Sequence, residues 1–227
     1  MKIYRSALIA SAGFAMVVLA ACGTDASNSG KNTSTVATET AAMQASNSAQ
    51  PAKLNPYAYL PQVSTFSLQS ETLKDGNPLP KAQMSGIFKV PGGTDTSPQL
   101  SWSGFPKETK SFVVSMYDPQ APTGSGFWHW VVADLPASTT SLPANAGIPT
   151  GGGLPVGALQ LKDDAGVPRY VGGAIPAGSG THNFYFTVTA LDVPKSGVDA
   201  TATPALLGFT IGSHTIARAT LVCPTVG

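Results

Sequence analysis

The stretch Phe184-Tyr-Phe-Thr-Val-Thr-Ala-Leu191 decides the fold class of this chain. Successive side chains of a β-strand point to opposite faces of the sheet. Every second residue from Phe184 to Ala190 is apolar, so one face of this strand is entirely apolar. The other face carries Tyr185, two threonines and Leu191. Such a pattern predicts a strand that lies in the core of a β-sandwich.

Further short runs of apolar, β-branched and aromatic residues surround this strand, separated by clusters of Pro, Gly and Asp. This punctuation is typical of all-β proteins. The sequence predicts a mainly β fold, an antiparallel β-sandwich with a few short helices. The best helix signal is Thr203-Pro204, a capping residue followed by proline at the first helical position. The other candidate strands are 66–68, 99–102, 111–117, 130–135 and 220–223.

Residues 1–21 have the pattern of an export signal, because Lys2 and Arg5 precede an apolar run that ends at Ala21. As a helix this run spans roughly 22 Å, less than the roughly 30 Å of a bilayer core. The stretch Leu19-Ala-Ala-Cys22-Gly23 resembles the bacterial lipobox, in which the chain is cut before the cysteine and the thiol carries a lipid. The alternative is an ordinary signal peptide and an incidental Cys22.

Residues 22–53 are rich in Ser, Thr, Asn, Ala and Gln and contain no aromatic residue, which predicts a flexible tether. Residues 54–227 are then the folded domain. With Cys22 acylated, Cys223 has no partner for a disulfide and is expected to be a buried core residue. We expect a lipid-anchored protein of the bacterial cell envelope. Gly23, in place of Asp, favours the periplasmic face of the outer membrane in a cell with two membranes.

Charge and motifs exclude several common functions. The formal net charge is +1, and removal of Lys2 and Arg5 makes it −1, which gives no basis for binding nucleic acid. The sequence has no G-x-S-x-G, S-x-x-K or Walker A pattern. Common hydrolase and nucleotide-binding functions therefore lack support.

An acid and two histidines stand at the ends of candidate strands. Asp118 follows the strand 111–117, while His129 and His182 come just before the strands 130–135 and 184–191. Imidazole N–H groups can donate hydrogen bonds to an oxyanion, with Asp118 orienting one ring. The N–H groups of Gly172 and a neighbouring glycine can approach a phosphate closely. From residue types alone, a purely structural role for the histidines is favoured over a functional one.

Four motifs carry a resemblance to a known family. They are Asp118-Pro-Gln-Ala-Pro122 with Gly126-Phe-Trp-His129-Trp-Val-Val132, Tyr170-Val-Gly-Gly173 with Gly180-Thr-His182-Asn-Phe184, Thr96-Ser-Pro-Gln-Leu-Ser-Trp102, and His214-Thr-Ile-Ala217. In this order they resemble the phosphatidylethanolamine-binding protein family, in its bacterial Raf-kinase-inhibitor-like branch. The resemblance covers the chain from about residue 63 onward.

The resemblance implies a β-sandwich with a small pocket for phosphate, phosphoryl head groups or carboxylates. Its residues, carried over by motif, are Asp118, Pro122, His129, Gly172 and His182, together with Gln120 where the usual motif has a second aspartate. An amide there removes a negative charge and adds N–H donors. The implied function is binding of a small anionic or phosphorylated ligand without catalysis, cofactor or metal.

Two alternatives remain. Relatives include inhibitors of kinases and proteases, so the pocket rim is also a candidate docking surface for a protein partner such as an envelope protease. Two histidines and a carboxylate are also the donor set of a metal site, which would activate water for hydrolysis. The resemblance favours ligand binding over both.

Overall fold

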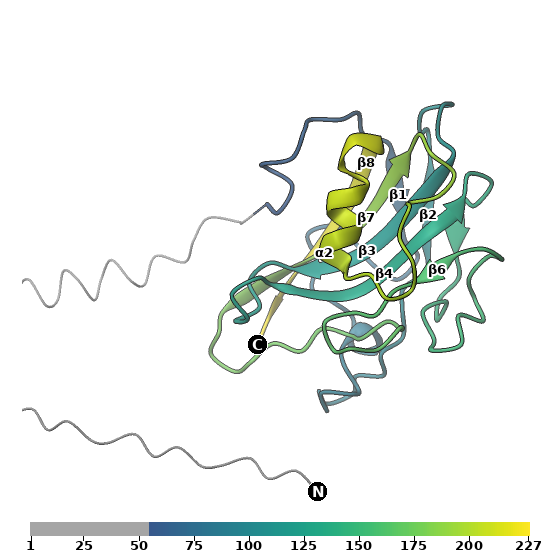
Figure 1. Ribbon diagram of the computed structural model, residues 1–227. Coiled ribbons are helices and arrows are strands. Elements are labelled where there is room, and N and C mark those ends of the chain that lie inside the picture. The colour runs from purple at the N-terminus through teal and green to yellow at the C-terminus, as the bar shows by residue number, and fades with distance from the viewer. Residues whose placement is uncertain (1–54) are drawn as a thin grey trace, which may run out of the picture. The chain divides into compact units, whose positions relative to one another are not determined.

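The computed structural model describes residues 55–227, which form two antiparallel β-sheets and a few short helices (Figure 1). The predicted signal segment 1–21, the tether 22–53 and Cys22 lie outside the described residues. The strands are β1 (Ser67–Gln69), β2 (Leu100–Ser103), β3 (Ser111–Asp118), β4 (Phe127–Pro136), β5 (Ser141–Leu142), β6 (Leu159–Gln160), β7 (Thr181–Leu191) and β8 (Thr215–Val226). The helices are η1 (Lys81–Gln83), α2 (Pro204–Thr210) and η2 (Gly212–His214).

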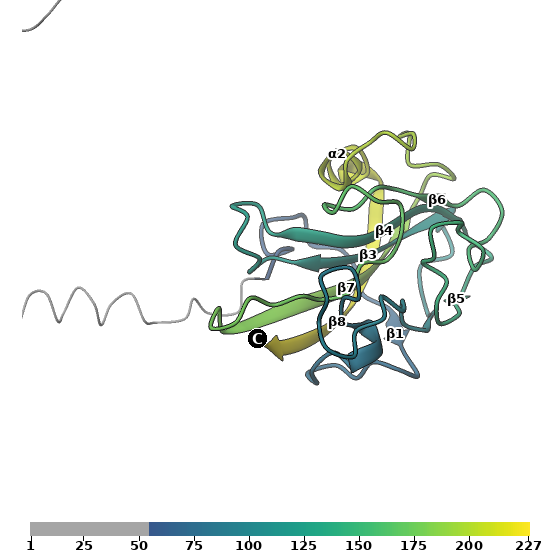
Figure 2. The ribbon, with the colours of Figure 1, turned by 90° about the horizontal axis from the view of Figure 1, so that it is seen from below.

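The larger sheet has the strand order β6-β4-β3-β7-β8 and is covered on both faces. The smaller sheet, β1-β2-β5, packs on one face, and α2 packs on the other, as Figure 2 shows. Phe184, Phe186, Val188 and Ala190 lie in the core between the sheets, which confirms the prediction for this strand. Leu191 lies in a second apolar cluster on the outer face, together with Leu207 of α2. This double coverage explains why β7 is buried along almost its whole length.

The predicted antiparallel sandwich is confirmed, but several strand boundaries differ from the prediction, most of all those of β4, β7 and β8, which are longer than predicted. β4 begins at Phe127, because this residue pairs with the last residue of β3, Asp118. β7 begins at Thr181, which pairs with Val226 of β8. His129 and His182 are therefore strand residues and do not precede the strands, because pairing with neighbours extends each strand beyond its apolar run.

The predicted helix start and the predicted burial of Cys223 are also confirmed. The Thr203 hydroxyl accepts a hydrogen bond from the Leu206 N–H at 3.1 Å, and Pro204 is the first helical residue. Cys223 lies fully buried in the core between the sheets, and burial raises the pKa of its thiol to about 12. Across residues 55–227, no helix has the length and hydropathy that a membrane crossing requires.

Asp95 joins two loops at the end of the sandwich where the candidate site lies. It is buried and has a φ of 52°, a conformation that aspartate tolerates better than most residues. Its Oδ1 accepts hydrogen bonds from the Ser85 hydroxyl at 3.0 Å and the Gly172 N–H at 2.8 Å. Its Oδ2 accepts from the N–H groups of Gly86 at 3.0 Å and Ile87 at 2.9 Å. One carboxylate thus fixes the segment around Gly172 against the 84–87 turn.

Asp95→Ala is expected to lower the free energy of unfolding by about 3 kcal/mol, because it leaves buried N–H donors without acceptors. Urea unfolding followed by tryptophan fluorescence measures the change. Glu108→Ala, at an exposed position, is the control and is expected to stay within about 0.5 kcal/mol of the wild type. An Asp95→Ala value equal to that of the control would contradict this role.

Candidate functional site

The candidate site lies at one end of the larger sheet, where the pairing of β3 brings three strand ends together. β3 runs antiparallel to both β4 and β7, so its end lies beside the first half of each neighbour: Asp118 pairs with Phe127, and Tyr117 pairs with Tyr185. Asp118, His129 and His182 meet there, with exposed fractions of only 2%, 4% and 1%. The expected convergence of these side chains is therefore present, in an almost closed cluster.

Asp118 and His182 form a short ion pair inside this cluster. His182 Nδ1 lies 2.6 Å from Asp118 Oδ2, and because a carboxylate accepts, Nδ1 carries the proton. The other carboxylate oxygen, Oδ1, accepts the Gln120 N–H at 2.9 Å. Asp118 thus orients the His182 ring and the start of the loop after β3 at the same time.

The second ring nitrogen of His182 contacts Ser179. Nε2 lies 3.0 Å from the Ser179 oxygen, and the Ser179 hydroxyl donates to the Pro176 carbonyl at 2.7 Å. Because a hydroxyl has only one proton, Ser179 in this arrangement offers Nε2 a lone pair.

The ring of His129 is held in its neutral form. Its Nδ1 lies 3.0 Å from the Val171 carbonyl, which only accepts, so Nδ1 carries the proton. Burial lowers the pKa of His129 to about 4, even though the Asp118 carboxylate nearby acts to raise it. At neutral pH its Nε2 is therefore a lone-pair acceptor. Donation from Nε2 to an oxyanion stays a prediction, and it requires a second proton on this ring.

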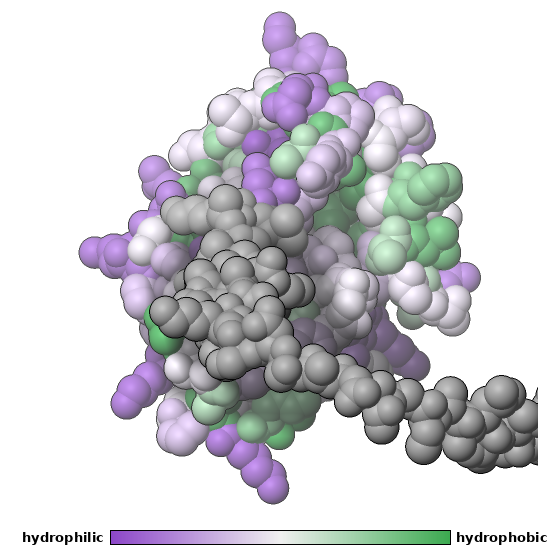
Figure 3. Space-filling view, turned by 90° about the vertical axis from the view of Figure 1, so that its left-hand side faces the viewer, coloured by the Kyte–Doolittle hydropathy of each residue, from purple (hydrophilic) through white to green (hydrophobic). Residues whose placement is uncertain are grey.

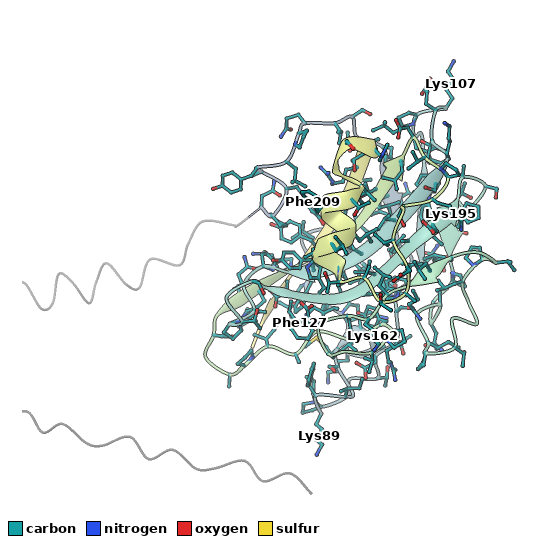
Figure 4. The ribbon with its side chains drawn as sticks, viewed as in Figure 1. Lys89, Lys107, Phe127, Lys162, Lys195 and Phe209 are labelled. Carbon is teal, nitrogen blue, oxygen red and sulfur yellow. The ribbon has the colours of Figure 1, made fainter. Side chains whose placement is uncertain are left out.

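Aromatic rings enclose His129. The ring of Phe127 lies 4.7 Å from it, and the ring of Phe184 lies 5.4 Å away in an edge-to-face arrangement. Phe88 in turn contacts Phe127 at 6.3 Å, and its side chain is 48% exposed. Phe127, labelled in Figure 4, is half-buried and lies between this exposed ring and the histidine. The surroundings of His129 are thus apolar, which accounts for its lowered pKa.

The glycines have a structural task that differs from the expected one. The Gly172 N–H donates to Asp95 at 2.8 Å, and the Gly173 N–H donates to the Gln83 carbonyl at 3.2 Å. Neither N–H is therefore free for a phosphate. A Cβ at Gly172 would overlap the backbone of Gln83 and Met84, so only glycine fits there. Gly172 faces His129 through its carbonyl group instead.

Gln120 lies at the cluster, whereas Pro122 does not take part in it. The Gln120 side-chain oxygen accepts the Asn183 N–H at 2.9 Å, which ties the loop after β3 to the start of β7. This side chain is half-buried beside the ion pair. Pro122 is exposed in the same loop, and a ligand contact there stays a prediction.

Three residues that support the candidate site were not predicted from the sequence, namely Asp95, Ser179 and Asn183. Ser179 lies in the glycine-flanked turn Gly178-Ser-Gly180, where only its position before His182 hints at a role. Asn183 contributes a backbone N–H, which no residue type reveals. In residues 55–227, no three His, Cys, Asp or Glu side chains are grouped as ligands for a metal ion.

The sequence of this chain matches that of known proteins. The family model described as "Phosphatidylethanolamine-binding protein" matches residues 69–225. The UPF0098 proteins YbcL and YbhB of Escherichia coli K12 are 42% and 45% identical over 158 and 161 residues. These matches cover 70% and 69% of this chain and 86% and 97% of the relatives.

Solved structures agree. The crystal structure of Escherichia coli YbcL, described as a member of the mammalian PEBP family, has a TM-score of 0.68 and 40% sequence identity. The match covers 71% of this chain and 98% of that one. A homologue from Chlamydia trachomatis has a TM-score of 0.58 and 28% identity, over 71% of this chain and 97% of the other. The shared fold, the motif order and the family match together show that this chain belongs to the phosphatidylethanolamine-binding protein family.

Proposed function

We propose that this protein binds a small anionic or phosphorylated ligand at the cluster of Asp118, His182 and His129, without catalysing a reaction. Phosphate, phosphoryl head groups and carboxylates share the required chemistry. The observation that carries the proposal is the buried Asp118–His182 pair, 2.6 Å long, beside a neutral histidine. A buried histidine with a strongly lowered pKa, as His129 has, is a candidate for a functional site. The family to which the chain belongs is one of binding proteins by its name.

Charge balance in the cluster shapes how an anion would bind. Asp118 and His182 form a hydrogen-bonded pair, and His129 is neutral at pH 7. The cluster thus offers an incoming anion no net positive charge. His129 can supply one by taking up a proton on Nε2, because a bound anion stabilises the imidazolium form. Ligand binding is therefore coupled to proton uptake.

The coupling predicts that affinity for acetate rises as pH falls from about 8 to about 6, by up to tenfold per pH unit. The free His129 has a pKa of about 4, and the bound anion raises it, so the complex holds more protons than the free protein. Acetate serves as the probe because its own charge is constant over this range. Isothermal titration in two buffers of different ionisation enthalpy measures the affinity and the proton uptake.

The matched variant is His129→Gln, which keeps a polar side chain but does not titrate. It is expected to bind acetate with an affinity that does not change with pH. Wild-type protein whose acetate affinity is also independent of pH would contradict proton uptake at His129. Failure of acetate and inorganic phosphate to bind at any of these pH values would contradict the anion site itself.

A substitution of Gln120 tests whether the site prefers purely anionic ligands to ligands that also carry an ammonium group. Gln120→Glu adds a negative charge, while a carboxylate oxygen can still accept the Asn183 N–H. We expect phosphate to bind roughly tenfold more weakly, and phosphoethanolamine to lose less because its ammonium group is attracted. Calorimetry with both ligands gives the ratio. Gln69→Glu makes the same charge change at an exposed position of β1. It should leave the ratio of the two affinities unchanged. An unchanged ratio in Gln120→Glu would refute this preference.

We also propose that the protein acts at the bacterial cell envelope, anchored by a lipid on Cys22. The lipobox-like stretch Leu19–Gly23 and the apolar run before it support this location. Cys22→Ser is expected to move the protein from the membrane fraction to the soluble fraction. Fractionation and immunoblotting measure the shift, and mass spectrometry of the wild type reports acylation. A wild-type protein without a lipid would contradict the anchor.

A further inference from the structure

A groove on the outer face of the larger sheet has no role in the anion site. It has a volume of about 410 Å³, within the roughly 300–1,000 Å³ that is typical of small-molecule sites. Segment 55–63, the outer face of β3 and β4, and α2 form its walls. The apolar lining includes Tyr57, Val63, Val113, Val131 and Leu207.

This groove and the histidine cluster use opposite faces of β3. Val113, Ser115 and Tyr117 line the groove, whereas the alternate residue Met116 faces the core between the sheets. Asp118 follows in that same alternation and pairs with His182 on the inner face. A ligand in the groove therefore does not reach the Asp118–His182 pair.

Arg218 is the charged side chain that lines the groove among the described residues. It projects from β8 beside Thr189 of β7, and it is half-buried. None of the ion pairs within residues 55–227 includes it. Its guanidinium lies over the Tyr57 ring, 4.9 Å from the centroid. A partly desolvated cation without a carboxylate partner attracts an anion more strongly than an exposed one.

The hydroxyl of Tyr57 adds a second polar atom with unused capacity. It is buried near Ser115 and Thr187 but forms no hydrogen bond of normal geometry with them. The groove lining includes Tyr59, which is 92% exposed, and Phe209 of α2, next in sequence to the lining residue Gly208, is 86% exposed. Figure 4 labels Phe209 on α2. Figure 3, in which the left-hand side of Figure 1 faces the viewer, shows a group of hydrophobic side chains at its right-hand edge.

We propose that this groove binds an amphipathic monoanion, a carboxylate on an apolar chain of the fatty-acid type. The apolar chain lies against Val113, Val131 and Leu207, and the carboxylate pairs with the Arg218 guanidinium. One cation in the groove matches one negative charge. Walls on three sides suit a narrow chain and not a folded protein partner. This second site is independent of the proposed anion site.

The test uses dodecanoate and the uncharged dodecanol as probes, titrated into the purified protein below their micelle or solubility limits. Trp128 lines the groove, so its fluorescence reports occupancy, and calorimetry gives stoichiometry and affinity. We expect saturable binding of one dodecanoate. Arg218→Met should weaken dodecanoate binding at least tenfold and leave dodecanol binding unchanged. Arg169→Met, outside the groove, is the matched control and should bind both probes as the wild type does.

A second variant tests where the apolar chain of the ligand lies and leaves the charge of the groove unchanged. Gly208 of α2 lines the groove, and a Cβ there would meet no atom within 4 Å. Gly208→Leu is therefore compatible with the fold and also favours the helix. It should abolish binding of both probes and leave the acetate affinity of the histidine cluster unchanged.

Three results would overturn the proposal. They are no dodecanoate binding by the wild type, equal dodecanoate affinity in Arg218→Met and the wild type, and retained binding in Gly208→Leu. Binding to phosphatidylcholine vesicles through the exposed side chains of Tyr59 and Phe209, without binding of free dodecanoate, would show that the face is a membrane contact and also refute the site. Each of these results leaves the proton-linked acetate site to be judged by its own experiment.

Discussion

The antiparallel pairing of β3 with β4 on one side and with β7 on the other is the constraint on which the candidate site depends. It places the end of β3 beside the first half of both neighbours, so Asp118 and His129 meet His182, which lies 64 residues beyond Asp118 in the sequence. The loops behind them add the supporting contacts. Asp95 fixes Gly172, and Ser179 and Gln120 hold the ion pair and the start of β7.

Burial determines the chemistry of this cluster. In a low-dielectric interior an isolated charge is costly, so charges occur as pairs and lone titratable groups become neutral. Asp118 and His182 form a hydrogen-bonded pair, and His129 follows the second rule, since burial lowers its pKa although the Val171 carbonyl acts to raise it. The arrangement leaves one unprotonated nitrogen of His129 next to the Asp118–His182 pair. The proposed ligand site is therefore expected to respond to protons as well as to ligand.

The larger sheet serves two chemically different surfaces because both of its faces are covered. On the inner face, the end of β3 carries a hydrogen-bonded cluster between two sheets. On the outer face, α2 and residues 55–63 leave an apolar groove in which Arg218 has no carboxylate partner. Strand alternation separates the two surfaces, since neighbouring residues of one strand belong to different ones. A protein of this size can thus hold two sites without coupling their charges directly.

The sequence alone determined the fold class, most strands, the start of α2 and the burial of Cys223, because these depend on local periodicity, capping and hydropathy. Motifs also indicated Asp118, His129 and His182. Only the tertiary structure decided that both histidines lie within strands, since cross-strand pairing extends β4 and β7 beyond their apolar runs. It also decided that the Gly172 N–H serves Asp95, that His129 is neutral, and that Arg218 lines an apolar groove. These features arise from contacts between segments distant in the chain, and a linear pattern carries no information about which donor, acceptor or charge a folded neighbour will supply.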